Sequence, residues 1–203
     1  MQKIGLIFVF LFSCATCRAE TLGTSGFHFF HTVSDDENPF FGGAGNQVAL
    51  HLGEAVDYGF IMGAPNRFVP YISVHMQYSQ PATFFRLPSR QSLNVSMNLG
   101  FGNKYGWKWN DFTIPIAYLS EDVILATYGR FYTGLGAGAG MQMQQNARIG
   151  SKLLFQFKWF LGYGLSDNYH LEVFAQHFSN GTTTPQCLNN SYNLWGVGVV
   201  YNF

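Results

Sequence analysis

The sequence predicts an all-β fold: an eight-stranded antiparallel transmembrane β-barrel with a polar interior and a lipid-facing apolar exterior. The first supporting observation is composition, because only 11% of the 203 residues are charged, while 18% are aromatic and 23 are Gly. A soluble chain of this length usually carries about 25% charged residues. The second is a period-two alternation of apolar and polar residues, which is typical of β-strands with two different faces. The third is the C-terminal strand, which ends in Phe203 and has apolar residues at the alternate positions before it.

The N-terminus has the features of a secretory signal peptide. Lys3 supplies a positive charge, residues 4–12 are apolar, and Cys17-Arg18-Ala19 offers a cleavage site. The apolar run is about half as long as the roughly 20 residues of a transmembrane helix. We therefore predict a signal peptide over residues 1–19 and one outer-membrane barrel over residues 20–203.

From Asn46 onward the sequence predicts eight strands of about 9 to 14 residues, the length with which a tilted strand crosses a bilayer. Pro115, inside the fourth segment, predicts a bulge or a break in the ladder. Residues 20–45 are either a first strand with a loop or an N-terminal lead-in. The alternation covers residues 46–52, 72–79, 93–101, 110–118, 128–143, 151–163, 168–179 and 191–203.

The two faces of these strands differ in side-chain size. The polar face is rich in Gly, Ser and Asn, and a row of glycines from Gly134 to Gly140 leaves space in a narrow lumen. The apolar face carries more large aromatic residues than the lumen of an eight-stranded barrel can hold. We therefore predict that the apolar face points to lipid and that charged polar-face residues form an ion-pair network filling the lumen. These residues are Arg130, Lys152, Lys158 and Glu172.

Several classes of function find no support in the composition. The formal net charge is zero, so no basic surface for nucleic acid is expected. After signal cleavage Cys187 is the one cysteine, and an intramolecular disulfide cannot form. The other mature histidines show no metal-ligand spacing with Cys or carboxylates, and neither a metal nor an organic cofactor is implied. We interpret them as structural or interfacial: His28, His31, His51, His75 and His170.

The seventh predicted strand carries a pair of residues that points to chemistry. His177 and Ser179 share one face of this strand, because side chains two residues apart in a strand point the same way. That face is otherwise apolar, and polar groups facing lipid are costly unless they lie near the interface. With both chain ends in the periplasm, the seventh strand ends at the cell surface, at the level of the outer-leaflet headgroups. A polar belt at the interface is the alternative explanation.

The sequence around this pair resembles the PagL-type lipid A 3-O-deacylases. The likeness covers residues 113–203: a Thr-x-Pro strand (Thr113-Ile114-Pro115), a glycine-rich strand, an H-x-S-N-(A/G) motif at residues 177–181, and a last strand ending in Tyr-x-Phe. The resemblance implies an eight-stranded outer-membrane barrel and an esterase that hydrolyses the ester-linked 3-hydroxyacyl chain at position 3 of lipid A. Its partner would be lipopolysaccharide in the outer leaflet. Whether the barrel forms a homo-oligomer stays open.

The resemblance also implies roles for individual residues. Ser179 corresponds to the nucleophile and His177 to its general base, while Asn180 or the backbone N–H of Gly181 corresponds to the oxyanion donor.

One residue of the family pattern is missing. The glutamate that these enzymes supply about twelve residues after the serine falls on Ser191, and no carboxylate follows Glu172 in this chain. Asn193 and Ser191 share the outward parity, so either is expected to orient His177 as a neutral partner, with weaker activity. The alternative function is a non-enzymatic structural or adhesin-type outer-membrane barrel that retains the motif.

Overall fold

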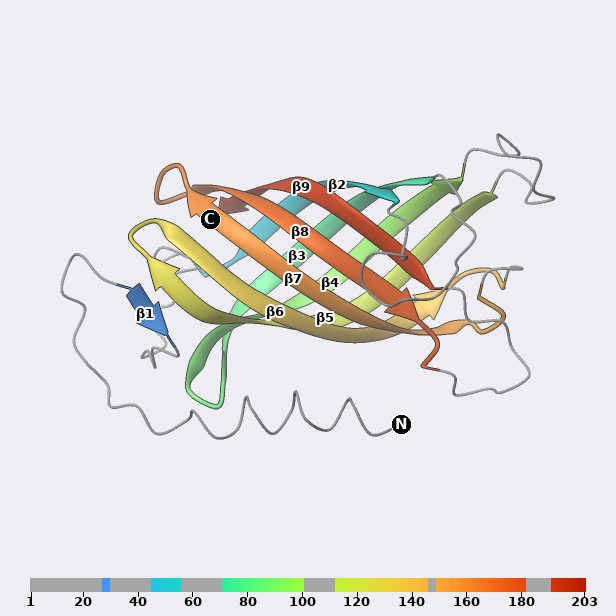
Figure 1. Ribbon diagram of the computed structural model, residues 1–203, viewed down its shortest axis with the longest axis horizontal. Helices are drawn as coiled ribbons and strands as arrows, with labels where there is room; N and C mark the ends of the chain where they lie inside the picture. The colour runs from blue at the N-terminus through green and yellow to red at the C-terminus, as the bar shows by residue number, and fades with distance from the viewer. Residues whose placement is uncertain (1–26, 30–44, 56–70, 101–111, 146–148, 182–190) are drawn as a thin grey trace.

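The computed structural model describes residues 27–29, 45–55, 71–100, 112–145, 149–181 and 191–203. Within these ranges the chain forms nine strands of one antiparallel sheet (Figure 1). They are β1 (Phe27–Phe29), β2 (Gln47–Ala55), β3 (Tyr71–Phe84), β4 (Leu87–Gly100), β5 (Phe112–Tyr128), β6 (Phe131–Gln142), β7 (Leu153–Gly164), β8 (Tyr169–Ser179) and β9 (Tyr192–Asn202). No helix among the described residues is long and apolar enough to span a membrane. The predicted signal peptide and most of residues 20–45 lie outside the described ranges.

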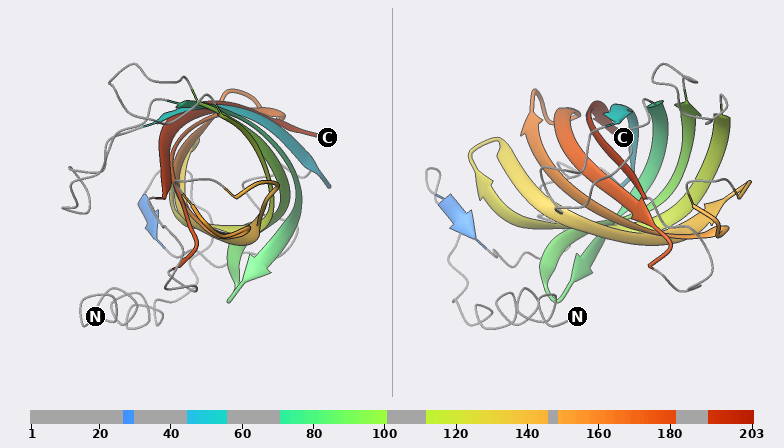
Figure 2. Two further views of the ribbon diagram at one scale, coloured as in Figure 1. Left: turned by 90° about the vertical axis from the view of Figure 1, so that its right-hand side faces the viewer. Right: turned by 45° about the vertical axis from the view of Figure 1, so that its right-hand side comes forward.

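Strands β2 to β9 close into a barrel, which confirms the predicted fold. Each strand pairs antiparallel with the next along the chain, and β9 pairs with β2 from Gln47↔Asn202 to Ala55↔Leu194. Figure 2 shows the closed ring of strands from its end. The short β1 lies outside the ring and pairs with the edge of β5 at Ala126–Tyr128.

The ladder registers show how strongly the strands are staggered. A path of directly paired residues that starts at Tyr169 returns to β8 at Ser179, ten residues further along the strand. For eight strands, this stagger corresponds to a strand tilt of about 40° and an interior that side chains can fill. The path runs through Tyr201, Val48, Tyr78, Leu93, Leu119, Ala139 and Phe155.

Strand β5 differs from the sequence prediction, because it continues through Pro115 to Tyr128 without a break there. Pro115 still pairs with Met97 of β4. Its carbonyl accepts from Met143 N, and the paired β6 ladder begins only at Ile116↔Gln142, so the missing N–H costs no bond within that ladder. The predicted bulge at Pro115 is therefore wrong, and the register shift lies between Ile124 and Ala126.

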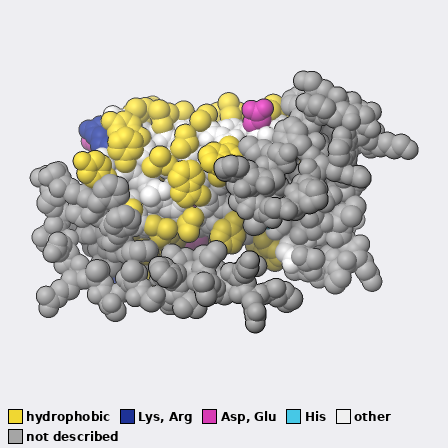
Figure 3. All heavy atoms as spheres, viewed as in Figure 1, with side chains coloured by type: hydrophobic (Ala, Val, Ile, Leu, Met, Phe, Trp, Pro, Cys, Tyr) yellow, Lys and Arg dark blue, Asp and Glu magenta, His cyan; other side chains and the backbone are white. Residues whose placement is uncertain are grey.

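The barrel wall has a polar inner face and an apolar outer face, as predicted. Along β7 every second residue is buried, and the exposed residues between them are all large and apolar. Figure 3 shows apolar side chains gathered over the outer wall of the strands. Other outward residues of this kind are Leu50, Met76, Leu93, Leu119, Val173 and Val197.

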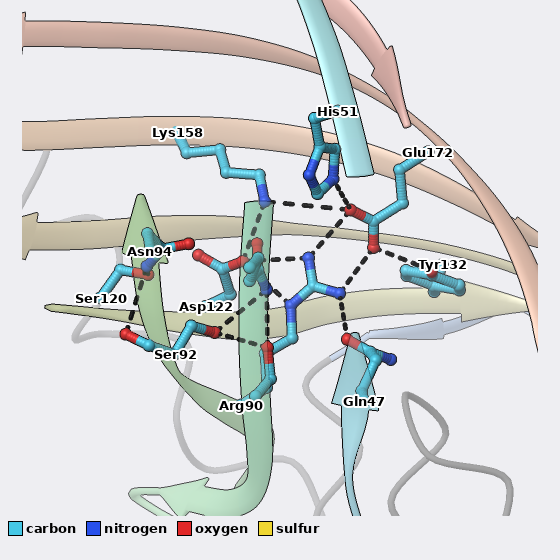
Figure 4. A network of polar contacts seen from close by, with 12 residues as sticks. Gln47, His51, Arg90, Ser92, Asn94, Ser120, Asp122, Tyr132, Lys158 and Glu172 are labelled. Carbon is cyan, nitrogen blue, oxygen red and sulfur yellow. Dashed lines mark hydrogen bonds and ion pairs between the residues drawn. The ribbon is translucent and has the colours of Figure 1, made fainter. Parts of the chain in front are cut away.

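A buried ion-pair network crosses the lumen (Figure 4). Arg90 of β4 contacts Glu172 of β8 (Nη1–Oε1, 2.8 Å) and Asp122 of β5 (Nη2–Oδ2, 3.0 Å). Lys158 contacts the same Asp122 oxygen (Nζ–Oδ2, 3.0 Å), and His51 contacts Glu172 (Nε2–Oε2, 3.2 Å). Because unpaired buried charges are costly, these contacts hold β2, β4, β5, β7 and β8 in one register.

The prediction of this network was correct for Lys158 and Glu172 and wrong for two other residues. Arg130 lies in the β5–β6 turn and donates to the carbonyl of Leu165 (2.8 Å). Lys152 precedes β7 and is exposed. Both residues sit beyond the ends of their strands, where alternation no longer decides which way a side chain points.

Small and apolar residues complete the lumen. A Cβ at Gly136 would overlap Asp122 Oδ1, so the predicted space beside the glycines of β6 is taken up by neighbouring side chains. At the barrel end where β8 stops, an apolar cluster fills the interior; it includes Tyr71, Ile116, Phe178, Tyr192 and Leu194.

Candidate functional site

His177 and Ser179 lie at the end of β8, on the outer face of the barrel, and both are half-buried. This end also bears the longer connections between strands, residues 56–70, 101–111, 143–152 and 180–191, whereas the opposite end has short turns. In outer-membrane barrels the longer loops are extracellular. By this rule the end of β8 is expected at the extracellular side, which stays a prediction.

The structure brings His177 and Asn193 together. They are directly paired across the β8–β9 ladder, and His177 Nδ1 lies 2.7 Å from Asn193 Oδ1. Asn193 Nδ2 donates to Ser191 Oγ at 3.2 Å, and the amide oxygen faces the imidazole. An amide oxygen only accepts, so Nδ1 is the protonated ring nitrogen and Nε2 is the basic one.

Ser179 shares the outer face with His177, but no described residue forms a hydrogen bond with its hydroxyl. The two side chains start from positions about 6.6 Å apart along the strand. Catalytic hydrogen bonds of this kind are often long before substrate binds. The structure therefore places nucleophile and base on one surface, without the hydrogen bond that would join them.

The two predicted oxyanion residues follow Ser179 beyond the end of β8. Asn180 is completely buried. Gly181 has φ = 63°, a left-handed conformation that glycine adopts without strain and that turns the chain away from the strand direction. The proposed use of its N–H stays a prediction.

Large apolar side chains surround the pair on the outer wall. Phe157 is the ladder partner of His177, and Phe155 is the partner of Ser179. Two residues toward the membrane centre, Ala175 lies between Trp159 and Trp195, whose ring centroids are 6.3 Å apart. The site is thus a small set of polar side chains near the end of β8, bordered by the apolar side chains of the outer wall.

The sequence analysis missed Glu54, an exposed carboxylate on the same wall. Glu54 is outward-facing in β2 and pairs directly with Trp195 of β9. It is far from the motif in sequence and comes near it because the first barrel strand closes against the last. Glu54 follows Leu50 and Leu52 at alternate positions of the strand, and this alternation could have shown that it faces outward.

The described residues hold no group of three or more His, Cys, Asp or Glu side chains arranged to bind a metal ion. Of the remaining histidines, His51, His75 and His170 are buried inside the barrel. His51 and His75 stack with ring centroids 5.0 Å apart, and His75 lies 2.9 Å from Asn94 Oδ1. The side chain of His28 and all of His31 lie outside the part of the chain that can be described.

No protein-family model matches this sequence, and no curated protein sequence matches it either. Among solved structures, the barrel is similar to Neisserial surface protein A, NspA, with a TM-score of 0.56 and 12% identity over 78% of this chain and 96% of that chain. It is also similar to the outer membrane protein Ail of Yersinia pestis in a phospholipid bilayer nanodisc, with a TM-score of 0.47 and 11% identity over 79% of this chain and 99% of that chain. At such identities the likeness to NspA is one of fold alone: this chain is an eight-stranded antiparallel β-barrel of the outer-membrane type.

Proposed function

We propose that this protein is an outer-membrane serine esterase that removes the ester-linked 3-hydroxyacyl chain at position 3 of lipid A. The observation that carries the proposal is the His177–Asn193 hydrogen bond, on the lipid-facing wall beside Ser179. A polar belt at the interface would not need an imidazole held in one tautomer. The H-x-S-N-G motif, similar to that of the PagL-type lipid A 3-O-deacylases, supplies the substrate class.

In the proposed acyl-transfer mechanism, Ser179, His177 and the oxyanion donor each have one role. Ser179 Oγ attacks the ester carbonyl while His177 Nε2 accepts its proton, since a serine hydroxyl is a poor nucleophile without a base. The N–H of Gly181 or the Asn180 amide stabilises the oxyanion of the tetrahedral intermediate. His177 then returns the proton to the departing sugar oxygen, and water releases the acyl group from Ser179 by the same route.

The position of the pair suits a membrane lipid as substrate. An ester at headgroup level in the outer leaflet can reach Ser179, and its acyl chain can lie along the apolar outer wall near Val173, Ala175, Trp195 and Val197. Asn193 is neutral and stabilises an imidazolium less than a carboxylate does, so we expect slower turnover than with an acidic third residue.

Mass spectrometry of lipid A from cells that express the wild type or Ser179→Ala tests the proposal. We expect the wild type to remove one 3-hydroxyacyl mass and Ser179→Ala to remove none. Unchanged lipid A with both proteins, each shown folded in the outer membrane, would leave the non-enzymatic barrel as the function. Deacylation that survives Ser179→Ala would place the reaction at another site.

A further inference from the structure

We infer that this barrel forms a homodimer in the membrane through a polar patch on the outer wall of β3, β4 and β5. The patch consists of Gln80, Gln91 and Glu121. In the dimer, Gln91 of each copy donates a hydrogen bond to Glu121 of the other copy. The dimer is independent of the proposed esterase activity, because the patch lies on a different part of the wall from His177.

The three residues of the patch stand side by side on an outer face that is otherwise mostly apolar. Gln91 is exposed on β4 and pairs directly with Gln80 of β3 and with Glu121 of β5. Glu121 is partly exposed and shares the outward face of β5 with Leu119, whose side chain is 66% exposed. Direct cross-strand neighbours have Cβ atoms about 5 Å apart, so the three side chains form one row.

The carboxylate of the patch lies far from both ends of the barrel. Leu119 is on the path of paired residues that climbs from Tyr169 to Ser179, five of its eight steps along. Glu121 is two residues further along β5, toward the β5–β6 turn, so it lies about midway between the levels of Tyr169 and Ser179. An ionisable group facing lipid at that depth is costly, and such groups usually have a polar partner.

The patch has hydrogen-bonding groups that the described residues leave unused. Ser89 donates to Oε1 of Glu121, and no described residue donates to Oε2. Gln91 forms no side-chain hydrogen bond with any described residue, including its ladder partner Glu121. An amide has two N–H donors and a carboxylate oxygen accepts, so the two unused groups are complementary.

A second copy of the chain satisfies both groups at once. A two-fold axis along the membrane normal, between β4 and β5, places Gln91 of each barrel opposite Glu121 of the other, so the hydrogen bond is formed twice. Lipid tails offer neither donors nor acceptors at this depth. Ala137 and Ala139 of β6, which pair with Glu121 and Leu119, are small and allow the two walls to approach closely.

This arrangement leaves the candidate functional site uncovered. Strand β8, which carries His177, is four strands away from β4 in either direction around the ring. Each copy in the dimer therefore presents its β8 wall to the surrounding membrane.

Disulfide cross-linking in isolated outer membranes tests the contact. A Cys187→Ser background removes the one cysteine that follows residue 19. Ala139→Cys then places a thiol close to the proposed axis, beside Leu119. Val199→Cys is the matched control, because Val199 is exposed on β9, four strands from β5 in either direction. We expect a covalent dimer with Ala139→Cys and little or none with Val199→Cys.

Exchanging donor and acceptor tests the specific pair. Energy transfer between labelled copies in lipid vesicles measures the association constant, and each variant is shown to be folded by its heat-dependent gel mobility. Gln91→Glu places carboxylates opposite each other, and we expect association to weaken about tenfold or more, since the symmetric dimer loses the hydrogen bond twice. The double variant Gln91→Glu/Glu121→Gln exchanges the two roles and should return association close to the wild-type value.

Mixed pairs of variants provide a further comparison. Copies with Gln91→Glu should associate more strongly with Glu121→Gln copies than with one another. In the mixed dimer each carboxylate again faces an amide, whereas two Gln91→Glu copies bring only carboxylates together.

The outcomes separate this dimer from its alternatives. Equal cross-linking of Ala139→Cys and Val199→Cys, or no dimer from a folded Ala139→Cys barrel, would overturn it. Cross-links from Ala139→Cys only to other proteins would also overturn it, because the patch would then serve a different partner. A double variant as weak as Gln91→Glu would rule out the Gln91–Glu121 pairing. Ser179→Ala should dimerise as the wild type does, so failure of the deacylation test would leave the dimer unaffected.

Discussion

The imidazole of His177 and the amide of Asn193 face each other across the β8–β9 ladder, 2.7 Å apart on the lipid side of the wall. The family that the sequence resembles has a glutamate twelve positions after the serine, and that position is Ser191 here. Ser191 contacts Asn193, so the hydrogen-bond chain reaches the imidazole through one additional residue. A neutral amide thus lies beside the histidine.

Substituting Asn193 tests this arrangement. We expect Asn193→Ala to lower the rate of lipid A deacylation about 10- to 100-fold, because the imidazole loses the hydrogen bond that selects its tautomer. The rate is followed by mass spectrometry of released 3-hydroxy acid. Ser191→Ala, which leaves the His177–Asn193 contact in place, should cost less. A larger loss from Ser191→Ala than from Asn193→Ala would contradict this order.

The lumen network predicts a strong effect on stability from Arg90. In Arg90→Met, Glu172 loses its shortest ion pair and Asp122 keeps only Lys158, so we expect a loss of about 3 to 5 kcal/mol in the free energy of unfolding. Urea unfolding in detergent micelles, followed by tryptophan fluorescence, measures it. Lys158→Met should cost less, since Asp122 retains Arg90 at 3.0 Å. Equal costs for the two variants would mean that Arg90 is not the centre of the network.

The glycine row of β6 predicts a steric cost. Gly136→Ala would push a methyl group against Asp122, and we expect the free energy of unfolding to fall by about 1 to 3 kcal/mol. Gly45→Ala is the control, because no atom lies within 4 Å of the added Cβ there. The same urea titration compares them, and equal stability of the two variants would rule out the crowding.

The outward facing of the wall is tested by placing a charge on it. Val173→Arg puts a guanidinium in the middle of the apolar face of β8, and we expect it to cost about 2 to 4 kcal/mol in a bilayer. Leu165→Arg, in the exposed β7–β8 turn, should cost less than about 1 kcal/mol. Unfolding in lipid vesicles measures both. A Val173→Arg barrel as stable as Leu165→Arg would mean that this face does not contact lipid.

Sequence alone predicted the strands and their facing because both follow from alternation within a segment. His177, Ser179 and Asn193 were placed on one wall in this way. Ser191 was predicted there too, but it precedes β9 and has φ = 47°, so strand alternation does not decide where its side chain points. The partners of Arg90 could not be predicted, since Glu172 is 82 residues away and their meeting depends on the ladder registers of the whole barrel. Glu54 was missed for the same reason: only closure of β2 on β9 brings it beside Trp195. The predicted strand over residues 110–118 was wrong in two respects: β5 continues to Tyr128, and Pro115 makes no bulge because the β6 ladder begins only at Ile116↔Gln142.

The two faces of strand β8 lie in different environments, the barrel interior and the outer surface. Glu172 is buried in the lumen network, and five residues later His177 points out from the wall. The wall between them is one backbone thick, so insertion or deletion of a single residue between these positions would put both side chains on the same side. Either the carboxylate would then face lipid and lose its ion pairs, or the imidazole would enter the core and leave the outer surface. Substitutions, by contrast, can adjust either side separately, which lets the outer surface adapt to a new lipid while the interior stays unchanged.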